Sequence, residues 1–184
     1  MATARNPMSN TVLETERLVL RRLSMEDFEA LRKIHSDAEL MWVYGGVFDE
    51  EGTRAWIQRN LDRYRNAPMG LAFWAITLKE TGEVIGAGGC VWQETDRGVE
   101  LEVGYQIRRD QWSRGYATEM AKASFDYGFA MTDVDHIISL IRPDNAASRK
   151  VAEKNGLVVD REFDWKGIPH LVYVMTRERW AKIR

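Results

Sequence analysis

The chain has 184 residues, of which 45% are hydrophobic and 29% charged, and its formal net charge at pH 7 is −2. This length suits one domain with a sizeable core, and the composition is that of a soluble globular protein. The negative charge argues against non-specific binding to nucleic acid, and no apolar run approaches the roughly 20 residues that span a bilayer. The single Cys90 rules out an internal disulfide, and the three histidines lack metal-ligand spacing. We therefore expect a cytoplasmic protein that needs no metal and contacts neither nucleic acid nor membrane.

The predicted elements form one domain over residues 13–184, after a loose tail over residues 1–12 that lacks the apolar core of a signal peptide. Patterns of period two predict strands. They cover Leu18–Leu23, Leu71–Leu78, Val84–Trp92, Val99–Ile107, His136–Ile141 and, approximately, residues 158–165 and 168–177. Patterns of helical period predict helices. The first begins after Ser24, and the others cover Asp49–Ala67, Thr118–Met131 and residues 146–155.

Local signals support these elements. Ser24, with Asp27 three residues later, is typical of a capping box at the start of a helix. The central strand–helix–strand unit implies a right-handed parallel crossover, whereas the other strands follow one another as antiparallel hairpins. We therefore predict a mixed α/β fold. In the helix that ends at Met131, the residues expected to face inward are Met120, Ala121, Ser124, Phe125, Gly128 and Phe129.

The most informative stretch joins the strand Val99–Ile107 to the next helix through Arg114, Gly115, Tyr116 and Ala117. A strand, a tight turn and a helix N-terminus form an anion site, because unpaired N–H groups point outward and the helix dipole favours negative charge. Gly115 and Ala117 carry almost no side chain, so a phosphate can approach the backbone closely. On its own, an ordinary strand–turn–helix connection explains the pattern equally well.

A second strand–helix unit lies at residues 142–157. Asn145 is a good N-cap for its helix. Gly156 supplies the left-handed residue that ends the helix, and Leu157 is the apolar residue that follows in such a stop. These features are structural, but the combination of the two units is more specific than either unit alone.

Together the two units resemble the GNAT superfamily of acyl-CoA-dependent N-acetyltransferases, and most closely the branch that contains the ribosomal-protein N-terminal acetyltransferases. The resemblance covers nearly the whole chain. Residues 15–21 (TERLVLR) resemble the family's first strand, residues 102–105 (EVGY) its fourth and residues 112–119 (WSRGYATE) its pyrophosphate loop. Trp112 stands where the pattern usually has Gln or Arg, a departure that this branch tolerates. The implied fold is a mixed, mostly antiparallel central sheet with helices on both faces, whose fourth and fifth strands splay apart.

The resemblance also implies acetyl-CoA as co-substrate, with its pantetheine arm in the gap between the splayed strands like an added strand. Main-chain groups of Gln106 and Ile107 are then its expected partners, and the Asn145 amide contacts the same arm. Arg108 and Arg109 extend a basic rim beside the pyrophosphate loop. The loop residues expected to bind the cofactor are Trp112, Ser113, Arg114, Gly115, Tyr116, Ala117 and Thr118, with Ser148 near the thioester.

Two residues are candidates for acid–base catalysis. Glu102 lies on the polar face of its strand, where the pattern alone indicates a solvated side chain. The resemblance makes it a general base that acts directly or through water. Ser148, by pattern alone a spare polar group on a helix, is implied to protonate the departing thiolate. Glu100 has no such support and is expected to be a surface carboxylate, and Cys90 is expected to pack in its strand.

The acceptor site is defined by fewer signals. Trp42, Tyr44 and His170 are expected to line it, because loops at these places border the acceptor pocket in related enzymes. Trp42 and Tyr44 are equally compatible with packing in the core. Acidic residues nearby would complement a cationic amine. They are Asp37, Glu39, Asp49, Glu50 and Glu51.

We therefore predict a single-domain N-acetyltransferase that moves an acetyl group directly to a primary amine of a small molecule or a protein N-terminus. The main-chain N–H near Ile107 is the expected oxyanion donor. The alternative is a non-catalytic acyl-CoA-binding or sensing module with the same cofactor site. A P-loop hydrolase is not supported, because the sequence lacks that motif. The protein is expected to be a monomer or a homodimer.

Overall fold

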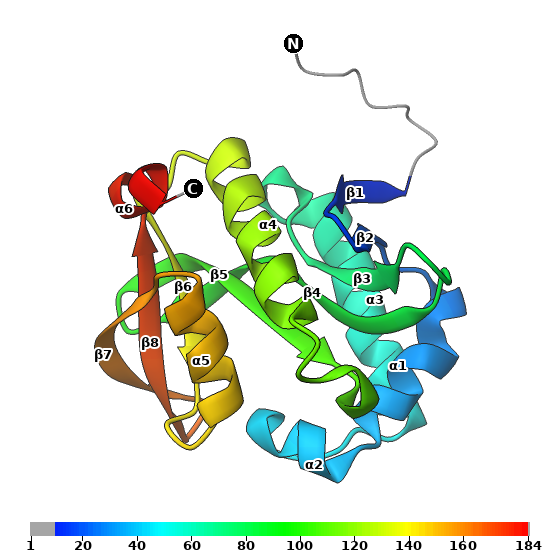
Figure 1. The fold of residues 1–184 in the computed structure, drawn as a ribbon. Coiled ribbons are helices and arrows are strands. Elements are labelled where there is room, and N and C mark those ends of the chain that lie inside the picture. The colour runs from blue at the N-terminus through cyan, green and yellow to red at the C-terminus, as the bar shows by residue number, and fades with distance from the viewer. Residues whose placement is uncertain (1–9, 184) are drawn as a thin grey trace.

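A computed structural model describes residues 10–183, and Figure 1 labels its elements. The strands are β1 (Thr11–Glu14), β2 (Leu18–Arg22), β3 (Phe73–Leu78), β4 (Val84–Thr95), β5 (Gly98–Ile107), β6 (His136–Ile141), β7 (Val158–Trp165) and β8 (Ile168–Thr176). The α-helices are α1 (Phe28–His35), α2 (Ala38–Met41), α3 (Glu50–Asn66), α4 (Tyr116–Met131), α5 (Ala146–Lys154) and α6 (Arg177–Ile183). Within this part of the chain, no helix has the length and apolar character needed to cross a membrane.

The strands form one sheet in the order β1-β2-β3-β4-β5-β6-β8-β7. Neighbours are antiparallel except β5 and β6, which run parallel because α4 carries the chain between them. β5 and β6 pair at Glu102 and Ile138, although β5 continues to Ile107 and β6 to Ile141. The two strands therefore separate beyond Glu102. The predicted fold, with its splayed central pair, is confirmed.

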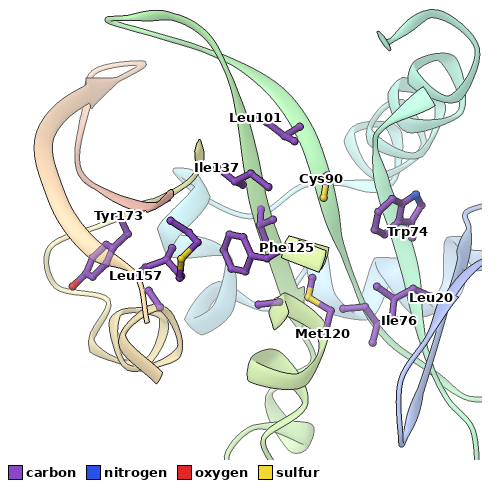
Figure 2. Packing of buried hydrophobic residues seen from close by; sticks show 14 of the residues in the cluster. Leu20, Trp74, Ile76, Cys90, Leu101, Met120, Phe125, Ile137, Leu157 and Tyr173 are labelled. Atoms are coloured by element: carbon purple, nitrogen blue, oxygen red, sulfur yellow. The ribbon is translucent and has the colours of Figure 1, made fainter. Parts of the chain in front are cut away.

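Two hydrophobic clusters hold the helices against the two faces of the sheet. On the face that α4 covers, Phe125 lies at the centre of the larger cluster (Figure 2). On the other face, Ile57 of α3 packs in a second cluster with residues of α1 and α2. Successive side chains of β3 point to opposite faces of the sheet. Trp74 and Ile76 therefore belong to the first cluster and Ala75 to the second. The six α4 residues that were predicted to face inward are all buried.

Most predicted boundaries are confirmed, and one is wrong. The capping box of Ser24 and Asp27 is present, and Gly156 adopts the left-handed conformation (φ +83°) that ends α5. Thr11 and Val12, which were expected to belong to the tail, begin β1 instead, where Thr11 pairs with Arg21 of β2. The rest of the predicted tail lies outside the described residues, apart from position 10.

Glu100 is buried in an ionic network rather than exposed as a surface carboxylate. Only 7% of the residue is exposed. Its carboxylate accepts hydrogen bonds from Arg161 of β7 (2.6 Å), from His136 of β6 (2.8 Å) and from the Thr95 hydroxyl. Burial opposes ionisation of Glu100, but these partners together hold its pKa below the ordinary value. The network therefore ties β5, β6 and β7 together at the end of the sheet where β5 begins.

We expect Glu100→Gln to destabilise the protein by about 2 kcal/mol at pH 7, because the partly buried Arg161 loses its closest carboxylate and keeps only Asp96 and Asp160. A lowered pKa stabilises the fold above the unfolded pKa, and this stabilisation is lost as the pH falls. The difference in free energy of unfolding between the variant and the wild type should therefore be smaller at acid pH. Urea unfolding at two pH values measures it, with Glu94→Gln as an exposed control. Equal stability of the Glu100 variant and the control would contradict the assignment.

Candidate active site

Alternate main-chain groups of β5 face the gap that opens between β5 and β6. The Val103 carbonyl accepts a hydrogen bond from Ser139 Oγ of β6 (2.7 Å). The Tyr105 carbonyl accepts one from the Tyr44 hydroxyl (2.8 Å). Ile107 has the same orientation, since main-chain direction repeats every second residue. Its N–H group therefore faces the gap, where an oxyanion would need a donor.

Gln106 has the opposite main-chain orientation. It pairs with Ala87 of β4, so its N–H and carbonyl point towards β4, and of the two main-chain partners expected for the cofactor only Ile107 faces the gap. Its side-chain nitrogen lies 2.9 Å from His35 Nε2, and His35 Nδ1 lies 3.2 Å from Thr53 Oγ1. Burial lowers the pKa of His35 to about 4, so the ring is neutral and accepts from the amide. This buried chain of polar groups joins β5 to α1 and α3.

The predicted pyrophosphate loop folds tightly before α4. Trp112 Nε1 donates to the Ile107 carbonyl (2.6 Å), so this indole N–H anchors the loop to the end of β5 and is not available to a phosphate. Ser113 (φ +61°) and Gly115 (φ +85°) both adopt the left-handed conformation, and α4 begins at Tyr116. No side chain caps this helix start. The first N–H groups of α4, including those in the turn with Ala117 and Thr118, therefore suit an anion.

The expected basic rim is largely neutralised. Arg108 pairs with Glu83 (2.7 Å), and Arg109 pairs with Asp37. Asp37, expected to add negative charge near the acceptor, is thus already engaged, and the Arg109 guanidinium holds its pKa below the ordinary value. Arg114 is exposed and forms no ion pair with any residue from 10 to 183. Of the three rim arginines, Arg114 is therefore the one free to meet a phosphate.

Arg17 supports this loop from the turn between β1 and β2. Its Nε donates to Glu119 of α4 (2.7 Å), and its Nη1 donates to the Arg114 carbonyl (2.9 Å). The guanidinium also stacks on the Tyr116 ring, 4.6 Å from the centroid, and the Thr15 hydroxyl donates to Glu119 (2.6 Å). These contacts fix the loop and the first turn of α4 together. Sequence analysis missed this role, because no periodic pattern reveals a partner about 100 residues away.

Ser148, Asn145 and Tyr105 converge between α5 and β5. Asn145 Oδ1 accepts from the Ser148 N–H (3.1 Å), so the predicted N-cap is confirmed and the Asn145 amide nitrogen can still donate. The Ser148 hydroxyl lies beside that of Tyr105, which is enclosed and has no hydrogen-bond partner of good geometry. Burial raises the pKa of Tyr105 to about 12, against a smaller opposite effect of Ser148. The Asn145 amide and the hydroxyls of Ser148 and Tyr105 thus gather between α5 and β5.

If Ser148 protonates the departing thiolate, Ser148→Ala should lower kcat about a hundredfold or less, at the lower end of what general acids contribute. A thiolate is already a fairly good leaving group, so a larger loss is not expected. The Michaelis constant for the amine should change little. Steady-state kinetics at saturating substrates measure this, and a wild-type rate would return Ser148 to a structural role.

Glu102 lies at the one position where β5 and β6 pair. The Leu140 N–H lies 3.4 Å from its Oε1. Burial raises the pKa of Glu102 to about 7, against smaller opposite effects of the Leu140 N–H and of the Arg63 charge. A carboxylate with a pKa near neutrality can both take a proton from an ammonium group and hold it. Glu102 therefore has the protonation behaviour that a base for amine chemistry requires.

Trp42 and Tyr44 are both engaged in contacts within the protein. The Tyr44 hydroxyl donates to β5. Burial raises the pKa of Tyr44, and the Glu102 charge raises it further. The Trp42 carbonyl accepts from Arg142 (2.9 Å), whose guanidinium lies 4.5 Å from the indole centroid. One face of Trp42 is thus covered by a cation of the protein itself and is not open to a cationic amine.

His170 is buried, with 5% of the residue exposed. Its Nδ1 lies 2.8 Å from the Ile168 carbonyl, and its ring meets Trp165 edge-on. The β7–β8 hairpin nevertheless reaches the turn after Tyr44, since a Cβ at Gly45 would lie 3.6 Å from Ile168 Cδ1. The predicted neighbourhood of loop and hairpin is therefore present, whereas the His170 ring is packed within the hairpin.

Other chemistry finds little support among the described residues. Cys90 is fully buried, its Sγ lies 3.2 Å from the Ser124 carbonyl, and burial raises the pKa of the thiol, so it is not poised as a nucleophile. Residues 10–183 contain no group of three or more potential metal ligands. A hollow of about 130 Å³ between α4 and α6 is lined by Phe129, Arg177 and Trp180 and includes no candidate residue.

Comparisons with known proteins agree with the fold. The profile of the acetyltransferase (GNAT) domain matches residues 17–158. The chain belongs to this GNAT family. The uncharacterized protein YkkB of Bacillus subtilis is 37% identical over 153 residues, 81% of this chain and 86% of that protein. The uncharacterized N-acetyltransferase p20 of Bacillus licheniformis is 32% identical over 158 residues, covering 82% and 86%. This GNAT protein is therefore an acyltransferase.

Solved structures extend the comparison. An acetyltransferase from Agrobacterium tumefaciens superposes with a TM-score of 0.77 at 30% identity, covering 95% of this chain and 100% of that one. Two more distant GNAT structures share the fold alone. RimL, a ribosomal alpha-N-protein acetyltransferase in complex with coenzyme A, has a TM-score of 0.73 at 16% identity. The aminoglycoside acetyltransferase AAC(6')-Ib, in complex with coenzyme A, has a TM-score of 0.74 at 16% identity.

Proposed function

We propose that this GNAT protein moves an acetyl group from acetyl-CoA directly to a primary amine. The observation that carries the proposal is the place of Glu102. Its carboxyl group, with a pKa that burial raises to about 7, lies where β5 and β6 begin to separate. A base at that point can serve an amine that approaches a thioester held between the two strands.

The proposed cofactor site is rich in donors, which suits coenzyme A. The uncapped start of α4 offers N–H groups to the pyrophosphate, and Arg114 adds a charge. The Asn145 amide nitrogen and the unpartnered Tyr105 hydroxyl can donate to the pantetheine arm or the thioester. The Ile107 N–H is the proposed donor to the thioester carbonyl as it gains negative charge.

In the proposed reaction, Glu102 accepts a proton from the amine, and the neutral nitrogen attacks the thioester carbonyl. The C–N bond forms, the now positively charged nitrogen loses its second proton to solvent water, the tetrahedral intermediate collapses and the C–S bond breaks. Ser148 donates a proton to the departing thiolate and is reprotonated from solvent. The proton that Glu102 accepted stays on it until product leaves. Because the amine attacks the thioester directly, no acyl group is attached to the protein.

An α-amine is the favoured acceptor. An α-amine with a pKa of about 7.8 loses its proton at pH 7 for about 1 kcal/mol, whereas a lysine side chain near 10.4 costs about 4.6 kcal/mol. A single carboxylate with a pKa near 7 is better suited to removing the proton of an α-amine than that of a lysine side chain. The likeness to RimL supports a Rim-type assignment with a protein N-terminus as acceptor, and the likeness to AAC(6')-Ib supports a small-molecule amine. A cytoplasmic monomer or homodimer remains our prediction.

A panel of amines tests the proposal, with acetyl-CoA as donor and thiol release as signal. The panel contains amino acids, peptides with free N-termini, polyamines and aminoglycosides. We expect amine-dependent thiol release with at least one class, and acetylated product by mass spectrometry. Tight binding of acetyl-CoA by calorimetry without thiol release for any amine would favour the non-catalytic acyl-CoA-binding module instead.

A further inference from the structure

Helix α3 presents two unpaired arginines on the acceptor side of the sheet. Arg59 is exposed and Arg63 is partly buried. Among residues 10–183, neither guanidinium forms an ion pair or a hydrogen bond. Burial and then the Arg59 charge lower the pKa of Arg63, and the one charge that acts in the opposite direction is that of Glu102. Arg63 is therefore a cation close enough to Glu102 for the two charges to interact.

This arrangement costs stability. Like charges four positions apart on a helix repel by a few tenths of a kcal/mol, and a partly buried cation without a paired carboxylate is unfavourable. Arg63 lies in the last turn of α3, where the helix dipole favours a cation, but the dipole supplies no carboxylate partner such as Asp62 gives Arg65 at 3.9 Å. A ligand with negative charge would remove both costs.

Phe73 places this part of α3 over the candidate base. Asn60 Oδ1 accepts from the Phe73 N–H (3.0 Å), and the Trp56 ring lies 5.8 Å from the Phe73 ring, so both α3 residues pack on this strand. A Cβ at Gly104 would lie 2.9 Å from Phe73 Cζ and 3.7 Å from Glu102 Oε1. The Phe73 ring therefore packs against the bare backbone of Gly104 and connects this part of α3 to the neighbourhood of Glu102.

The surrounding charges do not favour a polycation. Arg109 binds the carboxylates of both Asp37 and Glu39. Arg142 is a further cation, stacked on the Trp42 ring. The charge that acts on Glu102 itself is the positive charge of Arg63. An acceptor with a carboxylate fits this distribution better than an aminoglycoside or a polyamine does.

We propose that Arg63, assisted by Arg59, binds a carboxylate of the acceptor and that the substrate is an amine that carries such a group close by. The amine lies at Glu102 while its carboxylate pairs with the guanidinium, which holds the nitrogen in place for attack. A free amino acid and the N-terminus of an acidic peptide share this chemistry. The inference rests on the proposed acetyl transfer and names its substrate class.

Matched substrate pairs test the proposal. Leucine is compared with leucinamide, and aspartyl-alanine amide with asparaginyl-alanine amide, so that each pair differs in one carboxylate. The variants are Arg63→Met, Arg59→Met and, as a control in the same turn, Arg65→Met. We measure kcat/KM for each pair and express it as the ratio of carboxylate to amide, so that intrinsic differences in amine basicity cancel between proteins.

In the wild type we expect one of the two pairs to favour the carboxylate form. Arg63→Met should lower that ratio about ten- to hundredfold, Arg59→Met less, and Arg65→Met not at all, as for the loss of a charge-assisted hydrogen bond. If the ratio changes for the leucine pair, the acceptor is a free amino acid. If it changes for the aspartyl-peptide pair, the acceptor is a peptide N-terminus. A role of Arg63 in stability alone would lower both members equally and leave the ratio unchanged, which would overturn the proposal.

Two further outcomes separate this inference from the proposed function. If neutral or polycationic amines are acetylated and the carboxylate forms are not, the carboxylate site is wrong and acetyl transfer stands. If acetyl-CoA binds by calorimetry but no amine supports thiol release, the proposed function itself fails, and the carboxylate site fails with it. Thermal melts confirm that each variant is folded.

Discussion

Gly115→Asp is expected to abolish acetyl-CoA binding, lowering the affinity about a hundredfold or more. Gly115 precedes α4 in the left-handed conformation, next to the uncapped N–H groups. A Cβ there would lie 3.3 Å from Arg17 Nη2, so the new carboxylate would sit beside the guanidinium that fixes the loop. It would place a negative charge where the pyrophosphate needs positive potential, and such repulsion near a protein surface costs about 4 kcal/mol at close range. Calorimetry with acetyl-CoA measures the loss.

A matched control separates charge at the phosphate site from backbone strain. Gly82 also has positive φ (+72°) and no atoms within 4 Å of an added Cβ. Gly82→Asp introduces the same residue in the same backbone region in the turn before β4, so it should keep wild-type affinity. Undiminished binding by a folded Gly115 variant would mean that the phosphates bind elsewhere.

Glu102→Gln is expected to lower turnover about 10²- to 10³-fold while leaving acetyl-CoA affinity unchanged, because it removes a general base without touching the loop. In the wild type, kcat/KM should rise with pH through about 7, as the carboxyl group with that pKa ionises. In the variant, kcat/KM should no longer follow the ionisation of this carboxyl group and should change with pH only as the amine loses its proton. An unchanged pH–rate profile in the variant would remove Glu102 from the mechanism.

The same residue links activity to stability. Folding raises the pKa of Glu102 from 4.5 to about 7, so the protonated form is favoured in the folded state. Its contribution to stability is present below the unfolded pKa and is lost as the pH rises through 7. Glutamine stays neutral, so Glu102→Gln should match wild type near pH 4 and exceed its stability near pH 8 by about 1–3 kcal/mol. Thermal melts at the two pH values check this sign.

What sequence predicts well here is local. The inward face of α4 follows from period 3.6, and the caps at Ser24, Asn145 and Gly156 follow from short motifs, because the information lies within a few residues. Family resemblance added the splayed strands, which no local pattern contains.

What sequence misses depends on distant partners. Glu100 looks like a surface carboxylate until β7 brings Arg161 to it, 61 residues away. Gln106 has the right residue type for a cofactor contact, but its main-chain direction is set by pairing with β4. Arg109 looks like a free basic residue until the start of α2 brings Asp37 and Glu39 to it. In each case a tertiary contact decides the surroundings of a polar residue.

The central claim is that the acetyl group passes directly from coenzyme A to an amine. A single turnover with isotopically labelled acetyl-CoA, excess protein and an amine from the responding class tests it, with intact protein and small molecules followed by mass spectrometry. The account predicts label on the amine, at the rate of thiol release, and none on the protein at any time. Label that appears first on the protein, or only in free acetate, would contradict direct transfer.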